Sequence, residues 1–262
     1  TAAMDYLQEE KDRGITITAA AATLQWDNHL FHLIDTPGHI DFTVEVERSL
    51  RIIDGAVVIF SGVEGVEAQS EKVWHQAAEY DIPKLAFINK LDRTGASFHR
   101  VTKEINDKFQ RRAIPLQVPY GEEDSLSGVI DLLEMKLLAF SSSDNRQVTT
   151  ENIAADYIDL AHRYREHLLE TLSDYSDAVA TAYLQGEDIP VEQLKSRIRE
   201  LTIQNQIVPL LAGSAKNRIG IQSLMDAVTD SLPSPLDRGS ISADNPADKT
   251  KLTIQPDPDQ PF

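Results

Sequence analysis

The residues Asp35-Thr36-Pro37-Gly38 follow directly after the apolar run 30–34. An apolar run that ends in an acidic residue and a Pro-Gly pair predicts a buried strand ending in a loop. In an Asp-x-x-Gly arrangement the carboxylate can hold Mg²⁺ through water, and the glycine lets its backbone N–H approach a terminal phosphate. His39 comes next and could orient a water molecule beside that phosphate. The same residues could also form an ordinary strand-to-loop turn in which His39 has no special role.

A second chemical pattern, Asn89-Lys90-Leu91-Asp92, follows the apolar run 85–88. An aspartate at this position could accept two parallel hydrogen bonds from N1–H and the N2 amino group of guanine, which adenine cannot supply. Asn89 could pair with the other edge of the base, and the stem of Lys90 could cover a ring face. The pattern is short, and it also fits a solvated strand end.

Two weaker patterns complete the set. Gly213-Ser214-Ala215 follows another apolar run and could let a backbone N–H reach the guanine carbonyl oxygen, although small residues are common at strand ends. Thr16 could bind Mg²⁺ through its hydroxyl and a terminal phosphate through its backbone, so that loss of the phosphate releases its loop. Threonine is also simply favoured in strands.

Short apolar runs alternate with helical patterns along the chain. Strands are expected at 30–34, 55–60, 85–88 and 207–211, and helices at 43–53, 67–80, 97–112 and 221–232. This alternation predicts an α/β fold with a doubly wound, mostly parallel sheet and right-handed crossovers. The turn Asp27-Asn28 predicts a hairpin that joins 19–26 to 30–34. Ligands bind at the carboxyl ends of parallel strands, so we expect Asp35 and Asn89 on one rim of the sheet.

The pattern changes at Ile114, where short strands broken by Pro and Gly are followed by helical segments at about 154–172, 176–184 and 191–201. We expect residues 114–206 to form an inserted α+β subdomain in a domain made of 1–113 and 207–236. The polar, Pro-rich residues 237–262 are expected to form a linker. The chain begins as if within an element, which suggests a fragment.

Composition narrows the function classes. The 262 residues carry a net charge of −17 and contain no cysteine. Disulfides, thiol catalysis and Cys-ligated zinc are therefore excluded. The negative charge argues against broad non-specific binding to nucleic acid, which needs Lys and Arg. No apolar run approaches the ~20 residues needed to span a bilayer, so we expect a cytoplasmic protein without membrane contact.

In chain order, these motifs resemble the switch and base-reading motifs of the translational GTPases: Arg13-Gly14-Ile15-Thr16, Asp35 to His39, Asn89 to Asp92, and Gly213 to Ala215. The segments 41–49 and 89–96 resemble elongation factor G more narrowly. Residues 128–132 lie where that family carries its inserted G′ subdomain. The resemblance covers about residues 1–236.

The resemblance implies a P-loop GTPase-like fold, a GTP/GDP and Mg²⁺ site, and action on the ribosome. His39 matches the histidine that positions the attacking water when ribosomal RNA of the large subunit docks against it, and Ile15 matches an apolar gate beside it. Thr16 and Asp35 would hold Mg²⁺, and the insertion would meet the ribosomal stalk protein. We expect a monomer. The residues implied in nucleotide binding are Asp35, Thr36, Pro37, Gly38, His39, Asn89, Lys90, Asp92, Gly213, Ser214 and Ala215.

One departure from the family matters. The phosphate-cradling loop Gly-x-x-x-x-Gly-Lys-Ser/Thr should precede these motifs, and the sequence contains no Gly-Lys pair. The β-barrel domain expected after the linker is missing too. The chain as given is therefore not expected to bind GTP tightly or to hydrolyse it, whereas a full-length parent is.

Several alternatives remain open. Within the family they are a ribosome-recycling paralogue, a tetracycline-resistance ribosomal protection protein and a peptide-release GTPase. A metal phosphohydrolase could use His39 and Asp41, with His29 or His32. A non-enzymatic module could bind the stalk or a guanine nucleotide without turnover.

Overall fold

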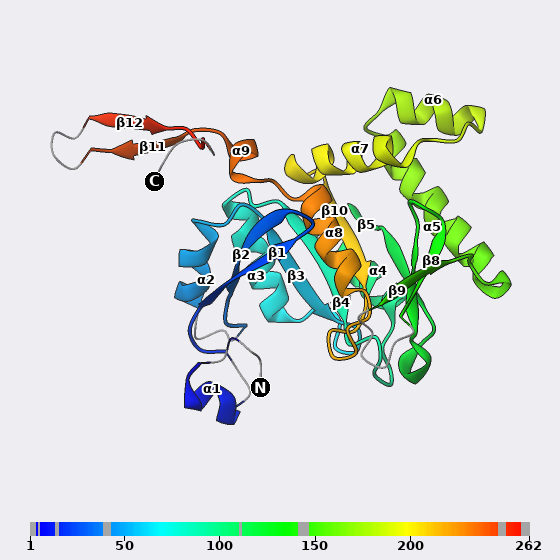
Figure 1. The fold of residues 1–262 in the computed structure, drawn as a ribbon, viewed down its shortest axis with the longest axis horizontal. Helices are drawn as coiled ribbons and strands as arrows, with labels where there is room; N and C mark the ends of the chain where they lie inside the picture. Colours follow the sequence, from blue (N-terminus) through cyan, green and yellow to red (C-terminus); the bar gives the residue numbers. More distant parts are fainter. Residues whose placement is uncertain are drawn as a thin grey trace.

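The centre of the molecule is a four-stranded parallel sheet with the strand order β3-β4-β10-β5 (Figure 1). The computed structural model describes residues 4, 6–13, 16–38, 43–109, 112–140, 147–245 and 250–257. The sheet strands are β3 (Ala56–Ser61), β4 (Lys84–Asn89), β5 (Arg112–Pro115) and β10 (Ile207–Ala212). This arrangement confirms the predicted α/β fold with a parallel sheet.

Helices cover both faces of this sheet. They are α3 (Ala68–Glu79), α4 (Phe98–Phe109) and α8 (Ile221–Ser231). In β4, Leu85 and Phe87 pack into the cluster that includes Ala227 of α8. Ala86 and Ile88 alternate with them and join the opposite cluster, which draws on α3 and α4. Because β4 is covered on both faces, its sequence is an unbroken apolar run rather than an alternating one.

An antiparallel hairpin lies apart from the parallel sheet. It consists of β1 (Ala20–Trp26) and β2 (His29–Asp35), flanked by α1 (Gln8–Arg13) and α2 (Thr43–Leu50). Asp27 and Asn28 both have positive φ, at 41° and 59°, as a tight two-residue hairpin turn requires. Within the described residues, neither hairpin strand pairs with β3. The expectation that one sheet carries both Asp35 and Asn89 is therefore wrong for the described strands, since no strand bridges β2 and β3.

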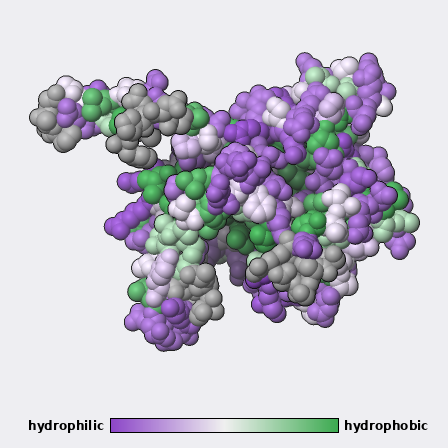
Figure 2. Space-filling model, in the orientation of Figure 1, coloured by the Kyte–Doolittle hydropathy of each residue, from purple (hydrophilic) through white to green (hydrophobic). Residues whose placement is uncertain are grey.

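Apolar side chains remain exposed on this part of the molecule. Leu30 and Leu33 of β2, Val44 of α2 and Ile59 of β3 are all exposed. Figure 2 shows green surface over the region that Figure 1 labels β2 and α2. β2 and β3 thus combine exposed apolar side chains with strand edges that no described strand pairs.

The segment after β5 forms a second sheet and a group of helices. The sheet is an antiparallel meander of β6 (Gln117–Tyr120), β7 (Gly128–Asp131), β8 (Lys136–Phe140) and β9 (Val148–Glu151). The single-turn helix η2 (Glu123–Ser125) precedes β7, and α5 (Ala155–Ser173), α6 (Asp177–Gln185) and α7 (Val191–Ile203) follow β9. Ile114 and Pro115, which the sequence placed in the insertion, instead pair with β10 in the parallel sheet.

The C-terminal segment, predicted as a linker, contains ordered elements. These are α9 (Pro235–Arg238) and a second hairpin of β11 (Ile241–Asp244) and β12 (Lys251–Ile254). Arg199 of α7 donates to the Leu232 carbonyl oxygen and to Asp237 Oδ2, each at 2.8 Å. The start of this segment is therefore anchored to the insertion. Among the described helices, none has the length and apolar character needed to cross a membrane.

Candidate functional site

The first part of the site lies at one end of the β1–β2 hairpin. Strand register places Asp35 opposite Ala20, so the segment that contains Thr16 and the loop that begins at Asp35 leave the hairpin at the same end. Thr16 and Asp35 are both half-buried, Pro37 is buried and Gly38 is exposed. Two residues separated widely in sequence are therefore brought to one end of the hairpin by a single antiparallel ladder.

Glu10 holds the Thr16 segment in place. It is not among the site residues predicted from the sequence. Its Oε1 accepts hydrogen bonds from the backbone N–H of Ile17 at 2.9 Å and of Thr18 at 3.0 Å. Its Oε2 accepts from the N–H of Leu7 at 2.8 Å. These backbone donors, Thr18 first, lower the pKa of Glu10 to about 2. In the sequence Glu10 is one of several acidic residues before Thr16, and nothing there shows that it is buried.

We expect Glu10→Gln to loosen the Thr16 segment. An amide oxygen is a weaker acceptor than a carboxylate, so the Ile17 and Thr18 amides should exchange with solvent about tenfold faster. Hydrogen exchange read by NMR measures this directly, with the exposed Glu9→Gln as the matched control. Equal exchange rates in the two variants would contradict a holding role for Glu10.

Acid should have the same effect as that substitution. The pKa of Glu10 lies near 2 in the folded chain, below its ordinary value of 4.5. Its stabilising contribution is therefore complete above about pH 4.5 and is lost as the pH falls towards 2. Protection of the two amides should decline over that interval in the native chain and stay flat in Glu10→Gln.

The second part of the site lies at the carboxyl ends of β4 and β10, which are neighbours in the parallel sheet. Asn89 Oδ1 accepts a hydrogen bond from the N–H of Lys90 at 2.7 Å and another from the N–H of Ala215 at 2.8 Å. The N–H of Leu91 donates to the Gly213 carbonyl oxygen at 3.3 Å. The structure thus brings together two of the motifs predicted from the sequence. The side chain of Asn89 joins them, because it bonds to the backbone of both.

The backbone geometry of these two loops restricts their sequence. Lys90 has φ +62°, a left-handed backbone conformation that residues other than Gly, Asn and Asp rarely adopt. A Cβ on Gly213 would lie 2.1 Å from the Ile219 carbonyl oxygen, so only glycine fits there. Ser214 is fully buried and its Oγ accepts from the N–H of Asn217 at 3.2 Å. Asp92 is partly exposed on the same rim.

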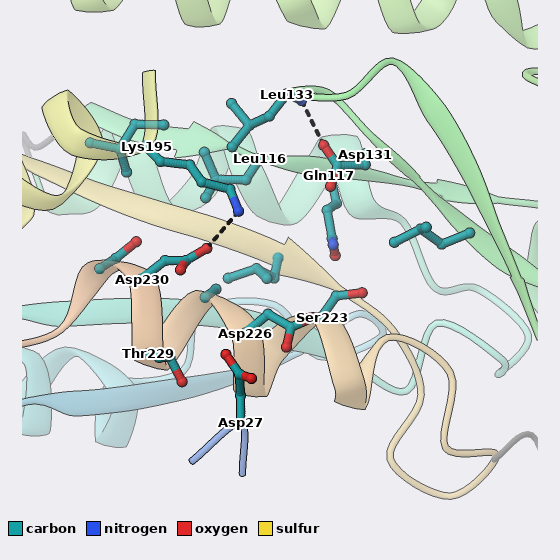
Figure 3. A pocket seen from close by; sticks show the side chains of 15 residues that line it. Asp27, Leu116, Gln117, Asp131, Leu133, Lys195, Ser223, Asp226, Thr229 and Asp230 are labelled. Carbon is teal, nitrogen blue, oxygen red and sulfur yellow. Dashed lines mark hydrogen bonds and ion pairs between the residues drawn. The ribbon is translucent and has the colours of Figure 1, made fainter. Parts of the chain in front are cut away.

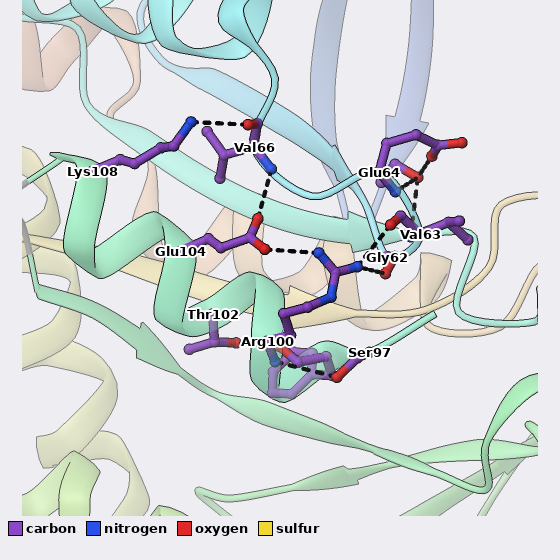
Figure 4. A network of polar contacts seen from close by, with 11 residues as sticks. Gly62, Val63, Glu64, Val66, Ser97, Arg100, Thr102, Glu104 and Lys108 are labelled. Carbon is purple, nitrogen blue, oxygen red and sulfur yellow. Dashed lines mark hydrogen bonds and ion pairs between the residues drawn. The ribbon is translucent and has the colours of Figure 1, made fainter. Parts of the chain in front are cut away.

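A polar network braces the loop that follows β3, and sequence analysis missed it (Figure 4). Arg100 of α4 donates to the carbonyl oxygens of Gly62 at 3.0 Å and Val63 at 2.7 Å. It also donates to Glu104 Oε1 at 2.7 Å, while Glu104 Oε2 accepts from the N–H of Val66 at 3.0 Å. The Val66 N–H, followed by Arg100, lowers the pKa of Glu104.

The braced loop touches the Asn89 motif directly. The N–H of Gly62 donates to the Asn89 carbonyl oxygen at 2.7 Å. Lys90 Nζ lies 3.4 Å from Glu64 Oε2 in the same loop. Arg100 and Glu104 of α4, the helix that follows this motif in the chain, therefore support the Asn89 motif through the loop after β3.

We expect Glu104→Gln to lower the free energy of unfolding by about 1–3 kcal/mol. The carboxylate accepts from Arg100 with one oxygen and from Val66 with the other, whereas an amide presents a donor on one side and leaves one contact unsatisfied. Urea denaturation measures the change. Glu79→Gln, on the exposed surface of α3, should be neutral, and an equally neutral Glu104→Gln would refute the bracing role.

The insertion also reaches the loop after β4. Glu123 Oε1 accepts from the N–H of Gly95 at 2.7 Å, three residues beyond Asp92. Gly95 has φ +81°, so its backbone turns in a way that favours glycine. The acidic turn 122–124 was visible in the sequence, but nothing there indicated its partner.

The donor set at the hairpin end fits a hard cation. Thr16 offers a hydroxyl and Asp35 a carboxylate, the oxygen ligands that Mg²⁺ prefers. Among the described residues no group of three or more His, Cys, Asp or Glu side chains could hold a metal. A cation here would therefore depend on phosphate oxygens and water for its other ligands, as Mg²⁺ usually does. The predicted catalytic residues His39 and Ile15 lie outside the described residues, as does Asp41.

Comparison with known proteins shows which family the chain belongs to. A crystal structure of a protein from Thermus thermophilus matches with a TM-score of 0.82 and 25% sequence identity, and the match covers 91% of this chain and 35% of that one. The chain spans about a third of the length of that protein. The family model for the elongation factor Tu GTP binding domain matches residues 1–234. Since that match contains both parts of the site, the chain belongs to the family of the elongation factor Tu GTP binding domain.

Proposed function

We propose that this chain is the guanine-nucleotide-binding part of a translational GTPase of the elongation factor G type. The single observation that carries the proposal is the joining of two motifs by Asn89, which fixes the loops after β4 and β10 as one surface. The family match supports a guanine nucleotide as the ligand. The chemistry is hydrolysis of GTP to GDP and phosphate during translation, with the ribosome as partner and the insertion as the contact for the stalk protein.

We assign guanine recognition to Asp92. Its carboxylate would accept from N1–H and the N2 amino group of the base, and adenine offers no matching donors. Lys90 would lay its methylene stem along the ring once its ammonium leaves Glu64, an exposed pair that costs little to break. The N–H of Ala215, which donates to Asn89 Oδ1 in this structure, would be shared with the guanine carbonyl oxygen when the base binds.

The phosphate end of the nucleotide needs a further segment. The Gly-x-x-x-x-Gly-Lys loop is not in this sequence, and we propose that another part of the full-length protein supplies it. The edge of β3 that no described strand pairs, with its exposed Ile59, offers a place where one more parallel strand could pair and lead into such a loop. Mg²⁺, when bound, would neutralise charge on the phosphates, with Thr16 and Asp35 on the protein side.

Hydrolysis is assigned to His39 on its sequence position alone. It follows the Asp35 loop directly and would orient the attacking water, with Ile15 as an apolar gate. Gly38 and the backbone of Thr16 would contact the terminal phosphate. Catalysis of phosphoryl transfer depends mainly on such positioning and on electrostatic stabilisation.

The test compares the full-length protein with this chain. A fluorescent GDP analogue should bind the full-length protein and be displaced by GTP but not by ATP, and ribosomes should stimulate its GTP hydrolysis. The chain alone should bind far more weakly, because the phosphate loop provides most of the contacts to the phosphates. ATP displacing the probe as well as GTP does would exclude the proposal. Nucleotide binding without ribosome-stimulated turnover would favour a non-catalytic stalk-binding module instead.

A further inference from the structure

A cavity of about 210 Å³ lies where the insertion meets the central sheet (Figure 3). Its walls come from β6, β7 and α7 on one side and from β10 and α8 on the other, with Asp27 of the hairpin turn at its mouth. A water molecule occupies about 30 Å³ in the liquid. The cavity therefore has room for one small organic molecule or for several waters.

Among the described residues that line the cavity, Gln117 is the one whose side chain carries a buried polar atom without a hydrogen-bond partner. Its side chain points across the cavity towards Ser223 of α8 (Figure 3). The residue is only 4% exposed, and its Oε1 has no hydrogen-bond partner among the described protein atoms. Buried amide oxygens are nearly always paired, because an unpaired one loses its water without replacement. The atom therefore indicates a donor that the described part of the protein does not provide.

The charged residues of the lining are mostly acidic and so also favour a ligand that donates hydrogen bonds. They are Asp27, Asp131, Asp226, Asp230 and Lys195. Lys195 pairs with Asp230 at 3.1 Å and also acts on Asp131, so four carboxylates share one cation among the described lining residues. Asp226 accepts a bond from Trp26 Nε1 at 2.7 Å. A carboxylate can accept about four hydrogen bonds, so acceptor capacity remains.

Asp131 is the lining carboxylate whose ionisation burial disfavours. Its Oδ1 accepts from the N–H groups of Leu133 at 2.7 Å and Glu134 at 2.9 Å. Burial nevertheless raises the pKa of its carboxyl group, because these two bonds do not offset the loss of water. Lys195 and Arg165 both interact with this carboxyl group, and a further cation beside it would relieve the remaining penalty.

The rest of the lining is partly polar, with Ser223, Thr229 and Ser231, and partly apolar, with residues that include Leu116, Leu133 and Leu211. Acidic groups lie on two sides of the cavity, at Asp131 on the insertion and at Asp226 on α8, and leucine side chains line part of the cavity. We propose that this cavity binds a small aliphatic diamine, whose ammonium groups meet Asp131 with Gln117 at one end and Asp226 at the other. The methylene chain lies on the leucines. Because the ligand contacts both sides, it holds the insertion against the core.

Calorimetric titration with 1,4-diaminobutane tests this site and does not require nucleotide binding. We expect saturable binding with a stoichiometry of one and a rise in the thermal unfolding midpoint. 1,4-Butanediol has the same chain and hydrogen-bonding ends but no charge, and it should not bind. In NMR spectra, the side-chain amide of Gln117 and the backbone amides of α8 should shift during the titration.

Variants locate the binding. Gln117→Leu and Asp226→Asn should each weaken binding about tenfold or more, and Asp226→Asn keeps an oxygen for Trp26 and so preserves the fold. Asp159→Asn on exposed α5 removes the same charge elsewhere and should have no effect. The proposal is overturned if the diamine does not bind, so that the cavity holds water only, if the diol binds equally well, or if Asp159→Asn weakens binding as much as Asp226→Asn.

Discussion

Replacing Asp92 with asparagine should lower the affinity of the full-length protein for GTP and GDP about a hundredfold. The carboxylate would accept two hydrogen bonds from guanine, and hydrogen bonds to a charged group contribute about 1.5–3 kcal/mol each. An asparagine amide replaces one acceptor with a donor, which then faces the N2 amino group. Competition against a fluorescent GDP analogue measures the loss.

The same variant should gain affinity for xanthine nucleotides. Xanthine carries an O2 carbonyl where guanine has an amino group, so the new amide donor finds an acceptor. Asp107→Asn, on the exposed face of α4, controls for the change in charge and should leave both affinities unaltered. A variant that kept its preference for guanine over xanthine would show that Asp92 does not read the base.

His39→Ala should slow ribosome-stimulated GTP hydrolysis by roughly two to four orders of magnitude, the range typical for loss of a group that positions or activates a nucleophile. The affinity for GTP should stay near normal, because the imidazole would act on water rather than on the nucleotide. Single-turnover hydrolysis in the presence of ribosomes separates the chemical step from binding and product release.

The matched control for this experiment is His162→Ala, which removes an exposed imidazole from α5. It should not alter turnover. If His39→Ala hydrolysed GTP at the native rate, the assignment from sequence order would be wrong, although guanine recognition by Asp92 could still hold. If it lost GTP affinity and turnover together, His39 would act in binding rather than in catalysis.

The insertion contacts the core beside residues that we propose to bind the nucleotide. Glu123 meets the backbone of Gly95 beside Asp92, and Arg199 connects α7 to the end of α8 and to Asp237. The apolar core is also continuous across the junction, since Val118 and Ile130 of the insertion share a cluster with Val208 of the central sheet. The insertion is therefore packed as part of the same body rather than attached by a flexible connection.

The sequence by itself determined the regular elements and their order. The apolar run 85–88 became β4, and the helical pattern at 67–80 became α3, within a residue or two at each end. This works because hydrophobic periodicity and Gly or Pro breakers are local signals. The motif Asn89 to Asp92 could be found for the same reason, since its residue types and its place after a buried strand are both visible in sequence.

Only the tertiary structure decided which of these elements meet. Asn89 joins Ala215 across 126 residues, and Arg100 reaches Gly62 across 38. Glu10 looked like one acid among several until the chain folded Ile17 and Thr18 onto it. The separation of the β1–β2 hairpin from the parallel sheet was equally invisible. Hydrogen bonds between distant segments depend on strand order and packing, and neither is encoded by any single stretch of sequence.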